Sequence, residues 1–139
     1  MVQQLLRKNA GASKSSSDRI RKQFGASSEL AVVRLLQQRG YTILATNFSC
    51  RGGELDIVAK LGTTVAFVEV KSRVAVSFPL STVITASKQR KIAQAARYFV
   101  RCRNLSQVAL RFDVAMVYGA AAEQTIDYIE HAFEVRQYD

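Results

Sequence analysis

Two strand-like runs joined by a short separator constrain the fold of this chain more than any other feature. Residues 54–59 and 64–71 are rich in Val, Ile, Leu, Ala and Phe, and four residues that include Gly62 separate them. A separator of this length favours a β-hairpin. Charged residues recur two positions apart within the runs, at Glu54 and Asp56 and at Glu69 and Lys71. Because side chains alternate along a strand, each pair shares one face.

Further helix and strand patterns flank this hairpin. We expect five strands, at residues 41–48, 54–59, 64–71, 108–118 and 124–129. One helix is predicted over residues 18–39, and a second runs to about residue 103 from a cap at Ser81 or Thr82. The inward stripe of the second helix is predicted to be Ile84, Ile92, Ala95, Ala96, Phe99 and Cys102. The order αβββαββ predicts an α/β (α+β) fold with a mixed central sheet flanked by helices.

Length and apolar content indicate one domain. A chain of 139 residues can bury roughly two thirds of its unfolded surface around one core. We expect residues 1–17, rich in Ser, Gly and Ala, to form a flexible basic tail and residues 18–139 to form the domain. No apolar run approaches the ~20 residues of a membrane span. The N-terminus has too little apolar sequence for a secretory signal, which favours a cytoplasmic location.

The charge is high and uneven. The chain has 20 Lys and Arg against 11 Asp and Glu, a formal net charge of +9. Residues 1–104 hold 18 basic and 5 acidic residues, whereas residues 105–139 hold 2 basic and 6 acidic ones. This asymmetry predicts that one side of the protein faces a polyanion, and nucleic acid is the commonest such partner. An anionic membrane surface, or a role of the charge in solubility alone, also fits.

The hairpin predicts that the charged residues of its two strands meet. If Lys60 pairs with Thr63 around a Leu61-Gly62 turn, Glu54 lies opposite Glu69, and Asp56 is a diagonal neighbour of Glu69. Their Cβ atoms would then lie within roughly 7–8 Å of each other. The prediction depends on the turn, because a single bulge would place the acids in different registers.

Acids grouped on an apolar strand face need a compensating charge, because a partly buried carboxylate loses several kcal/mol of solvation. Mg²⁺ or Mn²⁺ held by Asp56 and Glu69, with a main-chain carbonyl such as that of Val70, water and a substrate phosphate, would provide it. Lys71 could then polarise an attacking water. The alternative is a structural Glu–Lys pair on a solvated face, since short acidic motifs also arise by chance.

The two predicted helices each carry a charged residue that could reach this face. Glu29 begins the inward stripe of the first helix, and Lys88 precedes that of the second. The alternatives are a carboxylate favoured by the helix dipole and a lysine that extends to solvent. Arg90, Arg97 and Arg101 follow one another at near-helical spacing and could track a nucleic-acid backbone, or could form a solvated face.

Other chemistries lack their residues. The only histidine, His131, lies in the acidic end, so a histidine-dependent nuclease or a His-rich metal site is not expected. Neither GxxxxGK[ST] nor GxGxxG occurs, and Gly52-Gly53 is typical of a turn. Cys50 and Cys102 lack zinc-site spacing and are expected to be free thiols that fill space.

The hairpin region resembles the signature of a known bacterial family. Its sequence, from residue 47 to residue 73, is NFSCRGGELDIVAKLGTTVAFVEVKSR. Further matching features are Glu29, Gly40-Tyr41-x-Ile43-Leu44-x-x-Asn47, Ser87-Lys88-Gln89-x-Lys91, Arg111-Phe112-Asp113-Val114 and Ala132-Phe133. Over roughly residues 25–134 the chain is similar to the UPF0102 family, also called YraN-like proteins, with many separate motifs in the right order.

This resemblance implies a restriction-endonuclease-like fold, similar to archaeal Holliday-junction resolvases, and a metal-dependent endonuclease acting on DNA, branched or damaged DNA included. The implied catalytic residues are Glu29, Asp56, Glu69 and Lys71. Lys88, Arg90, Lys91, Arg97, Arg101 and Arg73 complete the expected nucleic-acid contacts. Junction resolution would require two sites and hence a homodimer. The alternatives are a non-catalytic nucleic-acid or ribonucleoprotein binder that retains the fold, and a chain kept for partner binding.

Overall fold

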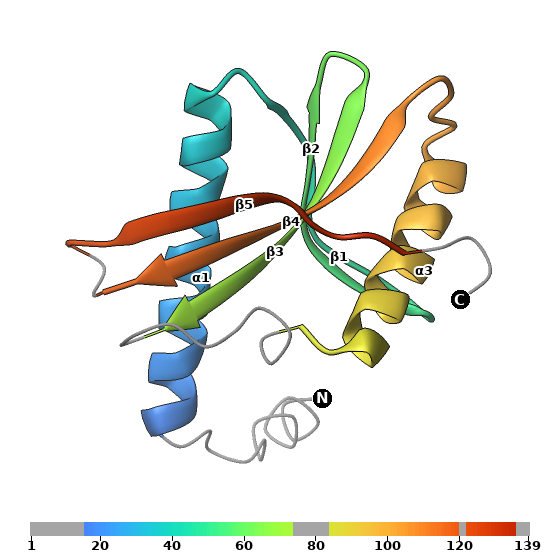
Figure 1. Cartoon of the computed structure of the whole chain (residues 1–139). Helices are drawn as coiled ribbons and strands as arrows, with labels where there is room; N and C mark the ends of the chain where they lie inside the picture. Colours follow the sequence, from blue (N-terminus) through green and yellow to red (C-terminus); the bar gives the residue numbers. More distant parts are fainter. Residues whose placement is uncertain (1–15, 74–83, 120–121, 136–139) are drawn as a thin grey trace, which may run out of the picture.

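A computed structural model of the chain describes residues 16–73, 84–119 and 122–135, with side chains from residue 26 onward except that of Arg73 (Figure 1). Its elements are α1 (Ser16–Gln38), β1 (Thr42–Cys50), β2 (Gly53–Leu61), β3 (Thr64–Arg73), α3 (Ala86–Cys102), β4 (Ala109–Tyr118) and β5 (Thr125–Phe133). The predicted order αβββαββ and the mixed α/β architecture are confirmed, and the arrangement is consistent with a nuclease-like fold. Within the described residues no helix is long and apolar enough to cross a membrane.

The five strands form one sheet in the order β1-β2-β3-β4-β5. Neighbouring strands are antiparallel except for β3 and β4, which are parallel. A parallel pair needs a crossover connection, and α3 lies in the connection between these two strands. The crossover brings the start of α3 back toward the sheet near residues of β3.

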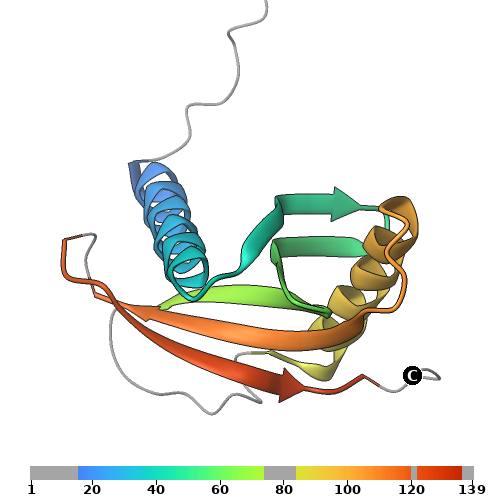
Figure 2. The same cartoon turned by 90° about the horizontal axis from the view of Figure 1, so that it is seen from above.

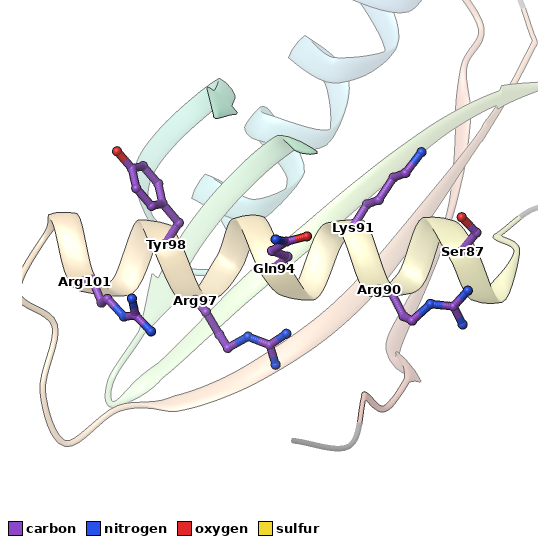
Figure 3. Close-up of a pocket in the computed structure, with 7 residues that line it drawn as sticks. All are labelled: Ser87, Arg90, Lys91, Gln94, Arg97, Tyr98 and Arg101. Atoms are coloured by element: carbon purple, nitrogen blue, oxygen red, sulfur yellow. The ribbon is translucent and has the colours of Figure 1, made fainter. Parts of the chain in front are cut away.

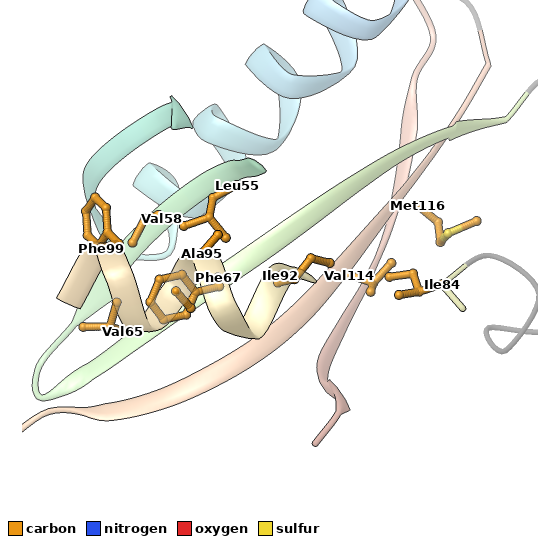
Figure 4. Packing of buried hydrophobic residues seen from close by; sticks show 11 residues of the cluster. Leu55, Val58, Val65, Phe67, Ile84, Ile92, Ala95, Phe99, Val114 and Met116 are labelled. Atoms are coloured by element: carbon orange, nitrogen blue, oxygen red, sulfur yellow. The ribbon is translucent and has the colours of Figure 1, made fainter. Parts of the chain in front are cut away.

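The two helices cover opposite faces of the sheet (Figure 2). On the α3 face, Phe99, Ile92 and Ala95 pack with buried residues of β2, β3 and β4 (Figure 4). On the α1 face, Val32 and Leu36 pack against the opposite sides of the same strands. Because the central strands are buried on both faces, they form nearly continuous apolar runs in the sequence, and a charged residue within them is conspicuous.

Both helices differ from prediction at their ends. α1 begins at Ser16 rather than residue 18 and continues through Gly25, and residues 1–15 of the predicted tail lie outside the described residues. α3 begins at Ala86 with Thr85 as its N-cap, so the predicted caps were wrong. Ser81 and Thr82 themselves lie outside the described residues.

The predicted inward stripe of α3 is confirmed from Ile92 to Phe99 but not at its end. Ile84 is buried, although it precedes the helix. Cys102 is exposed, so the space-filling role predicted for this thiol was wrong. The reason is that Ala93 is also buried, so the inward stripe of α3 is rotated away from the side of the helix on which Cys102 lies.

The hairpin of β2 and β3 forms in a different register from the one predicted. Leu61 pairs with Thr64 and Ile57 with Val68, so the chain reverses at Gly62-Thr63 rather than at Leu61-Gly62. Gly62 has a φ of 58°, a left-handed conformation that glycine adopts without steric cost. In the observed register the ladder ends at the pair Ile57 and Val68, so the next residues of the two strands, Asp56 and Glu69, lie level with each other. The predicted register had placed Glu54 opposite Glu69.

A buried ionic network fixes β4 against β5. Asp113 is fully buried and accepts hydrogen bonds from the Arg111 guanidinium, at 2.8 to 3.1 Å, and from the Tyr128 hydroxyl at 2.6 Å. It also accepts one from the main-chain N–H of His131 at 3.1 Å, where the β4–β5 register shifts. This motif stabilises the sheet, and the imidazole of His131 is not among the groups it uses.

Candidate active site

The sheet changes its geometry where Asp56 lies. Leu55 and Ile57 are two residues apart in β2, yet they pack in opposite cores. On β1, Asn47 lies between the partners of these two residues and has a φ of 52°, a left-handed conformation that asparagine tolerates better than most residues. The alternation of side chains is therefore broken at Asp56. Its carboxylate turns toward β3, where Oδ2 accepts a hydrogen bond from the N–H of Val70 at 2.9 Å.

Glu69 is the buried acid of the cluster and is held by two lysines. Only 5% of the residue is exposed. Its Oε1 lies 3.2 Å from Nζ of Lys71, on the same face of β3, and 3.5 Å from Nζ of Lys88, in the first turn of α3. The hydroxyl of Thr85 accepts a hydrogen bond from the N–H of Lys88 and anchors that turn. Lys88 thus approaches the sheet face from a helix end, as predicted.

Burial raises the pKa of the Glu69 carboxyl above its ordinary value, and the neighbouring charge of Asp56 raises it further. Lys88 and Lys71 act in the opposite direction and lower this pKa, but they do not fully offset the first two effects. Burial is therefore the largest reason why the carboxyl keeps a raised pKa despite its two lysine partners. A cation bound beside Glu69 would favour its ionised form.

Glu29 reaches the same cluster from α1. Burial raises the pKa of its carboxyl, a hydrogen bond from the side chain of Asn47 lowers it, and the charge of Asp56 raises it. Asn47 and Asp56 line one small cavity, which places the hydrogen-bond partner of Glu29 beside Asp56. The structure thus brings together four residues from three elements, as predicted: Glu29, Asp56, Glu69 and Lys71.

The carboxylates fit a magnesium ion bound largely by water and substrate. Within residues 16–73, 84–119 and 122–135, no group of three or more His, Cys, Asp or Glu side chains is arranged to hold an ion by itself. An ion would therefore depend on Asp56 and Glu69. The contacts of these two residues described above are made by Oδ2 of Asp56 and by Oε1 of Glu69. Mg²⁺ is commonly held in this way, by one or two carboxylates with several waters and a substrate phosphate.

Sequence reasoning gave no role to two groups that support this cluster. Asn47 supplies both the break in β1 and the hydrogen bond to Glu29. Ser28 is fully buried, and its Oγ accepts a hydrogen bond from the hydroxyl of Ser72 at 2.6 Å, which ties α1 to the end of β3. An asparagine within a strand-like run was a usable signal of irregular backbone, whereas nothing in the sequence pointed to the serine pair.

The predicted nucleic-acid residues of α3 lie on its solvent face. Arg90, Lys91, Arg97 and Arg101 are all exposed, and they line a hollow of about 680 Å³ along the helix (Figure 3). The backbone of Arg73 ends β3 near the cluster, but its side chain lies outside the described residues. The cluster and the basic face meet near the start of α3, which carries Lys88 in its first turn and Arg90 just after it.

Comparisons with known proteins identify the family to which this chain belongs. The sequence model described as "Uncharacterised protein family UPF0102" matches residues 28–117. A UPF0102 protein of Caldicellulosiruptor saccharolyticus is 40% identical over 116 residues, covering 81% of this chain and 98% of the relative. One from Desulfosudis oleivorans is 40% identical over 115 residues, covering 82% and 92%, and one from Geobacter metallireducens is 38% identical over 115 residues, covering 82% and 94%. The matched residues contain the whole acidic cluster and all of α3, and the chain belongs to the UPF0102 family.

Proposed function

We propose that this protein is a metal-dependent endonuclease that hydrolyses phosphodiester bonds of DNA. The observation that carries the proposal is the meeting of Asp56 and Glu69 beside Lys71, at the point where the β2–β3 ladder ends. Two carboxylates next to a lysine form a common arrangement for placing a divalent ion, a water and a phosphate together. The exposed arginines of α3 add the positive surface that a polyanionic substrate needs.

Each residue of the cluster has a role that follows from its position. Asp56 and Glu69 would hold the ion, with Asp56 oriented by the Val70 N–H. When bound, Mg²⁺ or Mn²⁺ supplies Lewis acidity toward the phosphate and the leaving oxygen. Lys71 orients the attacking water and offsets the charge that develops on the phosphate. The water oxygen bonds to phosphorus, the P–O bond breaks, and a proton from the water ends on the leaving oxygen.

Glu29 and Lys88 would act at the margins of this reaction. Glu29 lies near Asp56, so a carboxyl oxygen of Glu29 can accept a hydrogen bond from a water in the site and hold it in position. Lys88 is 40% exposed at its side chain, and its distance from Glu69 is longer than that of Lys71. It can therefore leave Glu69 and pair with a substrate phosphate.

The test is a nicking assay on supercoiled and branched DNA with Mg²⁺, Mn²⁺ or a chelator. We expect the wild type to cleave only with metal, and Asp56→Asn not to cleave. Glu54→Gln is the matched control, because Glu54 is an exposed acid of the same strand. Cleavage by Asp56→Asn at the wild-type rate would contradict the site assignment.

One observation favours a second candidate, a non-catalytic nucleic-acid binder. Glu69 already has two lysine partners, so the cluster has a purely structural role available to it. Calorimetric titration with Mg²⁺ and Mn²⁺ separates the candidates. Binding that depends on Asp56 favours the enzyme, and the absence of binding at millimolar metal favours the binder.

A further inference from the structure

A continuous basic hollow runs along α3 and onto the turn between β1 and β2. The hollow along the helix is about 680 Å³, and an adjoining one of about 920 Å³ reaches Arg51 and Gly52 of the turn. The two share Lys91, Gln94 and Tyr98. None of the described residues that line either hollow is acidic. An anionic ligand would therefore meet no repulsion from the lining of this surface.

The turn is pressed against α3 by its two glycines. A Cβ added to Gly53 would lie 2.8 Å from the main-chain oxygen of Lys91, and one added to Gly52 would lie 2.9 Å from the side chain of Gln94. At position 53 only glycine permits this approach without displacing the helix backbone, whereas at position 52 the Gln94 side chain would have to move. The consequence is that Arg51 is held beside a helix face that is already strongly basic. Gathering like charges opposes folding, and this cost is offset when a polyanion binds.

Tyr98 lies where the two hollows meet. It is 51% exposed, one of the few large apolar side chains at the surface among the described residues. Its ring is 6.2 Å from that of Phe48, at an interplanar angle of 36°, and Phe48 in turn packs edge-on against the buried Phe99. A hydrogen bond with Cys102 raises the pKa of the Tyr98 hydroxyl. The ring is thus supported from below by the core while one side remains open.

The arginines and the tyrosine project to different sides of the helix. Figure 3 shows Arg90, Arg97 and Arg101 on one side of α3, and Lys91 and Tyr98 on the other. From Arg90 to Arg101 the helix rises about 16 Å, enough to follow several nucleotides of a strand. A strand whose phosphates contact the arginines would have its bases directed toward Tyr98.

We infer that this surface binds single-stranded or unpaired nucleic acid, with a base stacked on Tyr98 and the backbone held by the arginines of α3. Exposed aromatic rings in a positively charged groove are the general means of binding single strands, because every base has a π-face. A closed duplex presents its phosphates but no free base face, so Tyr98 would add nothing to duplex binding. The inference rests on the proposed function only for the class of ligand, nucleic acid.

The experiment measures binding and not cleavage. Asp56→Asn protein with a chelator is titrated against fluorescently labelled oligothymidylate and against a relaxed circular duplex, which has no ends and so no free base face. Three forms are compared: Tyr98 unchanged, Tyr98→Phe and Tyr98→Leu. We expect Tyr98→Leu to weaken single-strand binding about tenfold and to leave duplex binding unchanged, because the stacking of one base is removed. Tyr98→Phe keeps the ring and should bind as the unchanged form does. A 2-aminopurine oligonucleotide should be quenched only by the two forms that keep an aromatic ring.

Equal single-strand affinity of all three forms would overturn the inference. An equal loss of affinity for single strand and duplex would also overturn it, since Tyr98 would then support the shape of the surface and would not stack on a base. Thermal melting of Tyr98→Leu shows that a loss of binding is not a loss of fold. Because no cleavage is measured, Tyr98-dependent binding would stand even if the nicking assay found no nuclease, and nuclease activity would stand without it.

Discussion

Asp56 and Val70 are joined by a hydrogen bond between a carboxylate and the main chain, with Oδ2 of Asp56 accepting from the Val70 N–H at 2.9 Å. The side chain thus takes the place of a strand partner at the point where the β2–β3 ladder stops. This one contact both satisfies an amide at the edge of the ladder and holds the carboxylate against β3, the strand that carries Glu69. Structure and chemistry are therefore coupled at Asp56.

Two substitutions of Asp56 should separate these two roles. The amide oxygen of Asp56→Asn can still accept from Val70, so we expect wild-type stability but no metal binding and no cleavage. Asp56→Ala leaves the Val70 N–H without this acceptor and should also lower the free energy of unfolding by about 1–3 kcal/mol. Denaturant unfolding and metal calorimetry on both variants test this. Equal stability of the two would show that the hydrogen bond contributes little.

Either Lys71 or Lys88 alone should be enough to stabilise the buried Glu69 carboxylate, but Lys88 should not replace Lys71 in catalysis. Each single alanine variant leaves Glu69 one cation, so we expect both to melt close to the wild type, with Lys71→Ala inactive but still able to bind metal. The double variant leaves a buried carboxylate without a lysine and should lose about 3 kcal/mol of stability at neutral pH. Adding Glu69→Gln to it should restore most of this loss. A Lys71→Ala protein with wild-type cleavage would show that the lysine is structural.

Glu69→Ala tests the ion directly, because Glu69 would be one of its two side-chain ligands. We expect this variant to lose both metal binding and cleavage, in contrast to Lys71→Ala. As a cation beside the ion, Lys71 opposes metal binding, so its removal should leave affinity unchanged or raise it. Calorimetric titration of the two variants gives the comparison. Unchanged metal affinity in Glu69→Ala would remove Glu69 from the ligand set.

The raised pKa of Glu69 predicts a pH dependence of stability in the absence of metal. Burial and the charge of Asp56 place the folded-state pKa above the unfolded one, so the folded protein holds this proton more tightly than the unfolded chain. The stabilisation is present below the unfolded pKa and is lost as pH rises through the folded pKa. We expect the stability of the wild type relative to Glu69→Gln to fall over this interval.

Mg²⁺ should oppose that fall, because it binds the ionised carboxylate. Urea unfolding at several pH values, with chelator and with Mg²⁺, measures both effects in the two proteins. The expected result is a difference between wild type and Glu69→Gln that declines with pH in chelator and declines less in Mg²⁺. A difference independent of pH in both conditions would contradict the coupling of Glu69 to its surroundings.

The basic face of α3 should determine the salt dependence of nucleic-acid binding. Replacing Arg90, Arg97 and Arg101 with Ala should weaken duplex binding evenly across sequences and reduce the salt slope by about 0.9 for each phosphate that is no longer neutralised. Arg34→Ala, an exposed arginine of α1, is the control for a single Arg97→Ala, because α1 covers the other face of the sheet. Equal slopes for these two single variants would place the nucleic acid elsewhere.

Three features of the protein could be predicted from its sequence: the strand alternation that places Glu69 beside Lys71, the apolar runs that form a sheet buried on both faces, and the order of the elements. These are local patterns, with periods of two and 3.6 residues that act within one element. The family resemblance pointed in the same direction, since it implied the same catalytic residues, Glu29 among them.

The sequence pointed to Asp56 and Glu69 as a pair, but which acid of β2 lies directly opposite Glu69 could be known only from the folded protein. The hairpin register depends on where the chain reverses, and a turn moved by one residue replaced Glu54 by Asp56. The break at Asn47 and the position of Tyr98 beside Arg51 were likewise not predictable from spacing. Both features follow from packing between elements that are distant in the chain. The burial of both sheet faces and the close fit of two glycines against α3 outweigh the conformational preferences of the individual residues.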